Sequence, residues 1–243
     1  MDSIKIKQAV ILCAGLGTRM RPLTDTMPKP MIPFFDKPLL EWNIEQFKKH
    51  GVTEFFINLY HLPDIIRDYF GDGKPWGVKI NYFQEKEALG TAGGVKDFES
   101  LLDSTFFVIY GDMFSLMDYS KMEKEFANYS DALGIQKMQK TDYYQDADVA
   151  EVAADNGYVA IHPKPHTTTY ANAYRMKGVF ILKKEILRYV PANTYFEIGK
   201  QLLPDIVRRG LKFYSYECDD YTKCIDDMEK YKEVEEFLKK NLK

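Results

Sequence analysis

The stretch that decides the fold runs from Gln8 to Met20 and reads QAVILCAGLGTRM. Its first part, Gln8 to Cys13, is a continuous apolar run, which is typical of a strand buried on both faces of a parallel sheet. The second part, AGLGTR, has two glycines that let backbone amides approach an anion closely and an arginine that can bind phosphate oxygens. We therefore expect a buried strand that leads into a phosphate-binding loop; a glycine-rich turn without a ligand is the alternative.

This loop differs from two common phosphate loops. The dinucleotide fingerprint needs glycine where this chain has Met20, and a Walker A loop needs Gly-Lys followed by Ser or Thr. A dinucleotide-dependent oxidoreductase is therefore disfavoured.

A second motif, MPKPM, spans Met27 to Met31 and holds Lys29 between two prolines that restrict the backbone. A lysine held in this way near a phosphate loop could clamp a phosphate. An ordinary exposed turn lysine is the alternative.

The chain around these motifs alternates strand-like and helix-like segments. We expect further strands at 53–59, 78–83 and 105–110, and helices at 38–50, with Gly51 ending the helix, 63–70 and 91–102. This alternation predicts an α/β fold with a mostly parallel sheet. The second half differs, with short strands at 147–154, 157–162 and 170–182, a helix at 197–209, a strand at 211–217 and a helix at 227–242. We read 1–243 as one domain with two halves, 1–130 and 131–243.

The charge balance excludes several classes of protein. The 243 residues contain 33 Lys and Arg and 36 Asp and Glu, for a net charge of −3. We expect no nucleic-acid or membrane partner, because no global positive charge attracts either. The apolar run at 9–14 is too short for a signal peptide, and no stretch approaches the ~18 residues of a membrane helix. A cytoplasmic protein is predicted.

Further motifs continue the pattern along the chain. They are Gly15-x-Gly17-Thr18-Arg19-x-Arg21-Pro22-Leu23-Thr24, Pro28-Lys29-Pro30-Met31, LGTAGG at 89–94, YGD at 110–112, Lys164-Pro165, Phe196-Glu197 and LLP at 202–204. Together they resemble the sugar-1-phosphate nucleotidyltransferases over essentially the whole chain. The resemblance implies a Rossmann-like, three-layer αβα fold with a mixed, mostly parallel central sheet and a small antiparallel elaboration on the sugar side. It also implies transfer of a nucleotidyl group from a nucleoside triphosphate (NTP) to a sugar 1-phosphate, with release of pyrophosphate and a requirement for magnesium.

The resemblance implies that the half at 1–130 binds nucleotide and that the half at 131–243 lies on the sugar-phosphate side. It also assigns roles to individual residues. The nucleotide would be bound by Leu12, Ala14, Gly15, Gly17, Thr18, Arg19, Glu85, Gly90 and Thr91. The sugar phosphate would be bound by Gly111, Lys164 and Gly178. The catalytic residues would be Arg19, Lys29 and Asp112, and Asp112 would also bind magnesium, since a carboxylate is a hard oxygen ligand. A helix cap is the alternative role for Asp112.

The choice of nucleotide depends on Glu85. A carboxylate there could accept hydrogen bonds from guanine N1 and N2, or from the ring N–H of uracil or thymine; a solvated charge cluster with Glu87 is the alternative. We favour GTP, because the 89–93 loop looks most like the mannose- and heptose-1-phosphate guanylyltransferases. Uridylyl, thymidylyl and cytidylyl transfer are the alternatives.

The sequence departs from the family near its end. The family's second metal-binding aspartate aligns with Cys224, and a thiol is a poor magnesium ligand. The chain could use one aspartate with phosphates and water, recruit Asp226, prefer another metal, or be impaired. A regulatory subunit that binds nucleotide with little catalysis is therefore the second hypothesis. Pro163 also replaces the glutamate that usually precedes Lys164, so the family does not reveal the sugar.

The helix expected at 227–242 has Met228, Tyr231, Val234, Leu238 and Leu242 on one face. We expect it to pack on the core; a contact between the subunits of a homodimer is the alternative.

Overall fold

The computed structural model describes residues 5–141, 145, 147–170 and 172–241. The chain forms two compact units, and each is built from separate stretches of sequence. Within the described residues, unit 1 comprises 5–6, 89–108 and 120–219, and unit 2 comprises 7–88, 109–119 and 220–241. The prediction of one domain over 1–243 stays a prediction.

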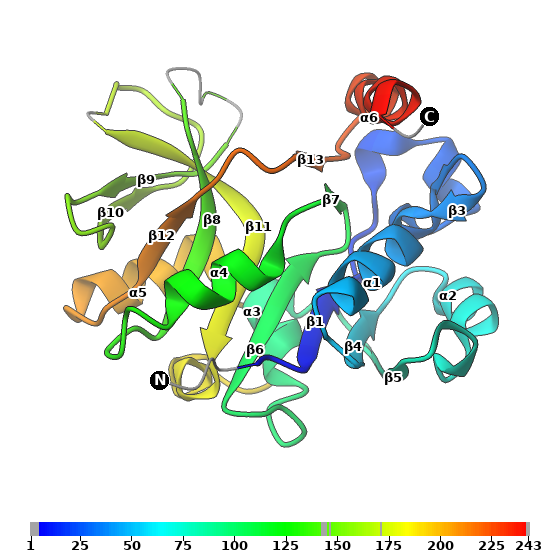
Figure 1. Cartoon of the computed structure of the whole chain (residues 1–243), viewed down its shortest axis with the longest axis horizontal. Helices are drawn as coiled ribbons and strands as arrows, with labels where there is room; N and C mark the ends of the chain where they lie inside the picture. The colour runs from blue at the N-terminus through cyan, green and yellow to red at the C-terminus, as the bar shows by residue number, and fades with distance from the viewer. Residues whose placement is uncertain (1–4, 142–144, 146, 171, 242–243) are drawn as a thin grey trace. The chain divides into compact units, whose positions relative to one another are not determined.

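Unit 2 is built on three parallel strands. These are β1 (Gln8–Leu12), β4 (Glu54–Leu59) and β5 (Lys79–Gln84), with Gln8 opposite Glu54 and Glu54 opposite Lys79 (Figure 1). Residues 9–11 of β1 have 0% exposure, as expected for a strand buried on both faces. The strand and loop order predicted from residues 8–20 is confirmed.

Two helices of unit 2 also lie where the apolar spacing predicts them. Helix α1 (Leu39–Lys49) buries Leu39, Leu40, Ile44 and Phe47, and it ends before Gly51, whose φ of 94° suits glycine. Helix α2 (Pro63–Phe70) begins at a proline and ends at Gly71.

Short elements complete unit 2. They are 3₁₀ turns at Thr18–Met20, Leu23–Asp25, Lys29–Met31 and Lys74–Trp76, the hairpin of β2 (Pro33–Phe34) and β3 (Lys37–Pro38), the antiparallel pair of β7 (Met113–Ser115) and β13 (Thr222–Cys224), and α6 (Met228–Asn241). Val234 and Leu238 of α6 are buried in an apolar cluster with Phe34, Phe114 and Ile225. The prediction that the last helix packs on the core is confirmed for Val234 and Leu238, whereas Met228 is exposed and Leu242 lies outside the described residues.

Unit 1 carries the antiparallel elaboration. Its strands are β8 (Gly134–Lys140), β9 (Val149–Val152), β10 (Tyr158–His162), β11 (Ala173–Lys183) and β12 (Tyr214–Glu217). The pairs β8–β11, β9–β11 and β9–β10 are antiparallel, whereas β8–β12 is parallel.

The helices of unit 1 are α3 (Gly90–Lys96), α4 (Tyr119–Phe126, whose first residue belongs to unit 2), a 3₁₀ segment (Lys184–Tyr189), a π-helical turn (Ile198–Leu202) and α5 (Leu203–Arg208). Strand β6 (Thr105–Tyr110) begins in unit 1 and ends in unit 2. The predicted α/β class, with a mixed, mostly parallel sheet and helices, is confirmed.

Two predicted helices are wrong in extent. Helix α3 ends at Lys96 instead of Leu102, because the hydrogen bonds tighten to the i→i−3 type at Phe98 N–Val95 O. The helix predicted over 197–209 is a π-helical turn followed by the short α5. Pro204 lies in the first turn of α5 and has no N–H to continue a helix from the preceding turn.

Among the residues described, no helix combines the length and the apolar character needed to cross a membrane.

Candidate nucleotide and metal site

The loop after β1 contains two glycines. Gly17 has a backbone conformation that favours glycine, and Gly15 has open space around it. Gly17 has a φ of 63°, and its carbonyl accepts hydrogen bonds from Met20 N at 2.9 Å and Thr24 Oγ1 at 2.8 Å. A Cβ on Gly15 would meet no atom within 4 Å, and Gly15 is exposed. Ala14 is half-buried and Thr18 is exposed. The loop therefore presents exposed backbone around Gly15 on a base that is held at Gly17.

Lys29 is a buried lysine, so the alternative of an exposed turn lysine is wrong. Its side chain is 9% exposed, and Nζ lies 2.9 Å from Asp112 Oδ2 and 3.5 Å from Asp226 Oδ1. Burial alone would lower the pKa of Lys29, but the two carboxylates outweigh it and the pKa is raised. Lys29 therefore keeps its positive charge at neutral pH.

Asp112 lies where β6 gives way to β7, so a strand follows it and the helix-cap alternative is wrong. Ile225 N donates to Asp112 O at 2.8 Å, and Met113 is opposite Cys224 in the β7–β13 pair. This pairing brings Asp112 close to the residues that directly follow β13. The preceding Gly111 donates to Leu12 O at 2.8 Å, and a Cβ there would lie 2.6 Å from the same oxygen. Only glycine fits this close approach.

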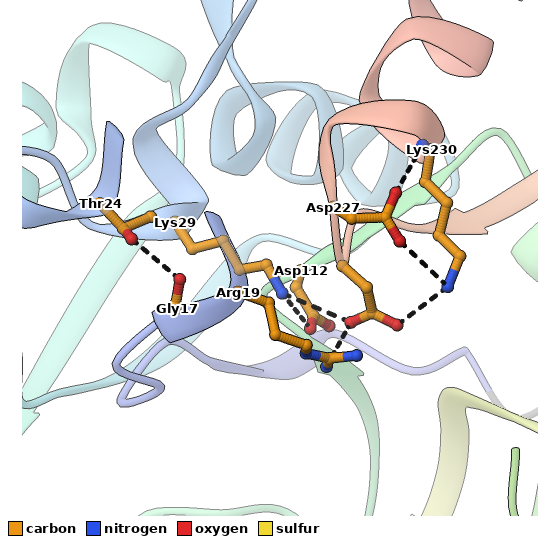
Figure 2. Close-up of polar contacts among 8 residues, drawn as sticks. Gly17, Arg19, Thr24, Lys29, Asp112, Asp227 and Lys230 are labelled. Atoms are coloured by element: carbon orange, nitrogen blue, oxygen red, sulfur yellow. Dashed lines mark hydrogen bonds and ion pairs between the residues drawn. The ribbon is translucent and has the colours of Figure 1, made fainter. Parts of the chain in front are cut away.

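The side chains of Asp112, Cys224 and Asp226 gather in unit 2. One ligand atom from each lies within 4.8 Å of the other two. Figure 2 shows Lys29 and Arg19 reaching towards Asp112 from the left of the view, with Asp227 and Lys230 on the right. Arg19 Nη2 lies 2.7 Å from Asp226 Oδ1. Burial would raise the pKa of Asp226, but the Cys224 thiol and the charges of Lys29, Arg19 and Lys230 lower it to about 2.

The two carboxylates fit a hard divalent cation, whereas the thiol does not. Asp112 Oδ1 is buried and has no hydrogen-bond partner among the described residues, so it has a lone pair for a ligand. The Cys224 pKa is raised, first by burial and then by Asp112 and Asp226, so the thiol stays protonated and hydrogen-bonds to Asp226. Asp112 and Asp226 could therefore hold magnesium, with Cys224 as a neutral neighbour.

Lys230 was missed from the sequence. Its Nζ lies 3.3 Å from Asp226 Oδ2, and its backbone N donates to Asp227 Oδ1 at the start of α6. The i,i+4 spacing from Asp226 was the available signal.

Glu85, the predicted reader of the base, is buried. It is 4% exposed, and Oε1 accepts a hydrogen bond from Asn58 Nδ2 at 2.7 Å. Asn58 Oδ1 in turn accepts from Cys13 N at 2.8 Å. Asn58 therefore ties Glu85 to the end of β1. It was missed from the sequence, although a polar residue within the apolar strand EFFINL was a signal.

Four of the predicted ligand-binding residues belong to unit 1. Gly90 has a φ of 72°, a Cβ on it would meet Phe196 O at 2.8 Å, and Thr91 Oγ1 accepts from Ile198 N at 2.8 Å. The two family segments at 89–94 and 196–197 are thus in direct contact. Lys164 is exposed, and its N donates to Asp148 Oδ1 at 3.0 Å. Gly178 is buried where the β8–β11 register shifts.

The chain belongs to the nucleotidyl transferase family, whose model matches residues 8–240. This confirms the resemblance to sugar-1-phosphate nucleotidyltransferases. A UTP–glucose-1-phosphate uridylyltransferase from Synechocystis is 34% identical over 228 residues, which are 87% of this chain and 58% of that protein. A D-glycero-alpha-D-manno-heptose 1-phosphate guanylyltransferase from Aneurinibacillus thermoaerophilus is 29% identical over 88% of this chain and 90% of its own length. Members of this family bind nucleotide and sugar phosphate and generally use a divalent metal ion.

Solved structures agree with the fold. HddC from Yersinia pseudotuberculosis aligns with a TM-score of 0.81 at 26% identity, over 96% of this chain and 100% of that one. A UDP-glucose pyrophosphorylase aligns with a TM-score of 0.82 at 20% identity, which bears on the fold alone. The chain spans between 43% and 64% of the first four curated relatives it matches.

Proposed function

We propose that this chain transfers a nucleotidyl group from an NTP to a sugar 1-phosphate and releases pyrophosphate. The observation that carries the proposal is the cluster of Lys29, Asp112, Asp226 and Arg19 in the same unit as the glycine loop. Both substrates are polyanions, so catalysis needs positioning and neutralisation more than covalent chemistry. A phosphate oxygen of the sugar 1-phosphate attacks the α-phosphorus, and the bond to the pyrophosphate oxygen breaks in line.

Each of these groups has a role in the proposed reaction. Lys29, which stays charged, offsets negative charge on the α-phosphate and leaving group. Arg19, 63% exposed, can exchange its contact with Asp226 for the triphosphate. The amides around Gly15 hold phosphate oxygens, Thr91 and Glu85 contact the nucleoside, and Lys164 holds the phosphate of the sugar. Magnesium bound by Asp112 and Asp226 would act as a Lewis acid and template.

We favour guanylyl transfer, with uridylyl, thymidylyl and cytidylyl transfer as alternatives. The heptose-1-phosphate guanylyltransferase of A. thermoaerophilus supports this choice, because 90% of its length matches this chain, against 58% for the uridylyltransferase. A cytoplasmic location and a homodimer stay predictions.

The first experiment is a pyrophosphate-release assay with magnesium, the five common NTPs and a panel of hexose and heptose 1-phosphates. We expect release with one dominant pair. Lys29→Ala and Asp112→Asn should each lower kcat by about 100-fold or more, the size expected for a group that stabilises transition-state charge. Lys74→Ala and Asp72→Asn, which alter an exposed pair joined at 2.7 Å, are the matched controls. Near wild-type turnover of Lys29→Ala or Asp112→Asn would refute the mechanism.

The second candidate is a regulatory subunit that binds nucleotide with little catalysis, and Cys224 at the metal cluster favours it. The discriminating variant is Cys224→Asp. A large gain in the magnesium-dependent rate would point to a weakened catalytic site.

A further inference from the structure

The metal cluster of unit 2 has a mixed donor set. Asp112 and Asp226 offer carboxylate oxygens and Cys224 offers sulfur, all within 4.8 Å of one another. When the sulfur is counted with the two oxygens, this donor set suits a borderline or soft metal better than the two carboxylates alone would.

Strand pairing holds the sulfur in place. Cys224 is paired with Met113 in β13–β7, and Ile225 N is bonded to Asp112 O at 2.8 Å. Ile225 is fully buried in the apolar cluster, and residues on either side of it in an extended chain share the opposite face. Cys224 and Asp226 therefore point together towards Asp112.

An ion can enter this cluster without breaking every existing contact. Asp112 Oδ1 is buried and without a hydrogen-bond partner among the described residues, while Oδ2 bonds to Lys29. The unpartnered oxygen is an acceptor that only a cation or a donor can satisfy.

The donor set discriminates between metals. Magnesium takes oxygen ligands and keeps several waters, so it would gain nothing from the sulfur. Zinc, cobalt and cadmium bind thiolate strongly and combine it readily with carboxylates.

We propose that this cluster binds a zinc-class divalent ion through Cys224 Sγ together with Asp112 and Asp226, more tightly than it binds magnesium. Binding releases the thiol proton to solvent. Because both ions need the same carboxylates, the zinc-class ion excludes magnesium and lowers turnover. This regulation rests on the proposed function, whereas ion binding does not.

The test is titration of the metal-free full chain with Co²⁺, followed by the sulfur-to-cobalt charge-transfer absorption in the near ultraviolet. In the wild type, this band should stop growing once one equivalent of Co²⁺ has been added. The Cys218→Ser control, which alters a half-buried cysteine of unit 1, should keep it. Cys224→Ser should lose it, and zinc affinity, measured by competition, should fall by about tenfold or more.

Two results would overturn the proposal: no charge-transfer band in the wild type, or a band that persists in Cys224→Ser. Circular dichroism and thermal unfolding identify a variant that fails to fold, and Cys224→Asp, which should also lose the band, provides a second test. Pyrophosphate release with magnesium alone is measured on the same samples. A cobalt–sulfur band without turnover would refute the proposed function and support the metal site. Turnover without the band would support the proposed function and refute the metal site. In an active wild type, zinc should inhibit at lower concentration than in Cys224→Ser.

Discussion

Lys29 keeps its charge in a buried position because two carboxylates face it. The ammonium bonds to Asp112 and lies 3.5 Å from Asp226, while Arg19 and Lys230 add positive charge around the same Asp226 carboxylate. The charges of Lys29, Arg19 and Lys230 together lower the pKa of Asp226.

Removing Lys29 should therefore change the pKa of Asp226. In Lys29→Ala, the pKa of Asp226 should rise above its value of about 2, because one of the charges that lower it is gone. Carboxyl-detected NMR titration of the metal-free protein measures this, with Lys74→Ala as the control. An unchanged Asp226 titration would contradict the assigned coupling.

Glu85 and Glu87 provide a paired test of base recognition. Glu85 is buried and bonded to Asn58, whereas Glu87 is exposed. If Glu85 accepts hydrogen bonds from guanine, Glu85→Gln should lower kcat/KM for GTP by about tenfold or more. The reason is that a hydrogen bond to a charged group contributes about 1.5–3 kcal/mol. Glu87→Gln should change it by less than about twofold on the same scale. Steady-state kinetics with each NTP measures both, and equal effects of the two variants would exclude Glu85 as the reader.

At the scale of elements, Glu54 joins the three parallel strands of unit 2. It accepts hydrogen bonds from Gln8 Nε2 of β1 at 2.9 Å and from Lys79 Nζ and Asn81 Nδ2 of β5 at 2.6 Å and 3.0 Å. Partial burial opposes ionisation, but these donors and the Lys79 charge outweigh it, so the pKa of Glu54 is lowered from 4.5.

This lowered pKa makes a prediction about pH and stability. Because the folded state favours ionised Glu54, its contribution is present above the unfolded pKa and is lost as pH falls through the folded pKa. Glu54→Gln should be less stable than the wild type at pH 7, by about 1 kcal/mol for the weakened hydrogen bonds. The difference should shrink below about pH 4.5. Urea unfolding at a series of pH values measures it, with Glu87→Gln as the control; a constant difference across pH would contradict the assignment.

Helix α6 should stabilise unit 2 through its buried face. Leu238 is 0% exposed, whereas Met228, on the same helix, is 46% exposed. Leu238→Ala should lower the free energy of unfolding by about 2–5 kcal/mol, and Met228→Ala by less than about 0.5 kcal/mol. Urea unfolding compares the two, and equal losses would show that the apolar cluster does not anchor the helix.

Strand β8 shows why one element escaped prediction. The sequence GIQKMQK of this strand lacks a clear apolar face, because polar residues occupy buried positions: Gln136 and Lys137 are both 2% exposed. Their polar atoms are satisfied by distant carbonyls: Gln136 Nε2 donates to Lys177 O at 2.7 Å, and Lys137 Nζ donates to Cys218 O. Such partners cannot be inferred from local spacing.

At the scale of the whole molecule, ligand binding should be measurable as stability. With GTP and magnesium at about 100 times Kd, the native state gains about 2.7 kcal/mol. For a chain of this length, this gain corresponds to a Tm increase of about 5–10 °C. Differential scanning fluorimetry with GTP and magnesium, compared with GTP and EDTA, measures the metal-dependent part. We expect Asp112→Asn to lose that part and Asp72→Asn to keep it. An equal increase with EDTA would mean that no divalent ion takes part in nucleotide binding.

The sequence by itself determined the elements around residues 8–20, the parallel sheet of unit 2, the family and the identity of its motif residues. The elements follow from short-range properties: the periodicity of apolar residues, the backbone freedom of glycine and the restriction by proline. The family follows from the motifs that this chain shares with it. The family resemblance also indicated Cys224 and Asp226, but it left their arrangement open.

Only the tertiary structure decided how these residues meet. Lys29 and Asp112 are 83 positions apart, and Arg19 and Asp226 are 207 positions apart. Their contacts depend on strand register and on burial, which set distances and local dielectric that no local pattern contains. For the same reason, Asn58 and Lys230 were not recognised, and the sulfur of Cys224 proved to lie beside two carboxylates.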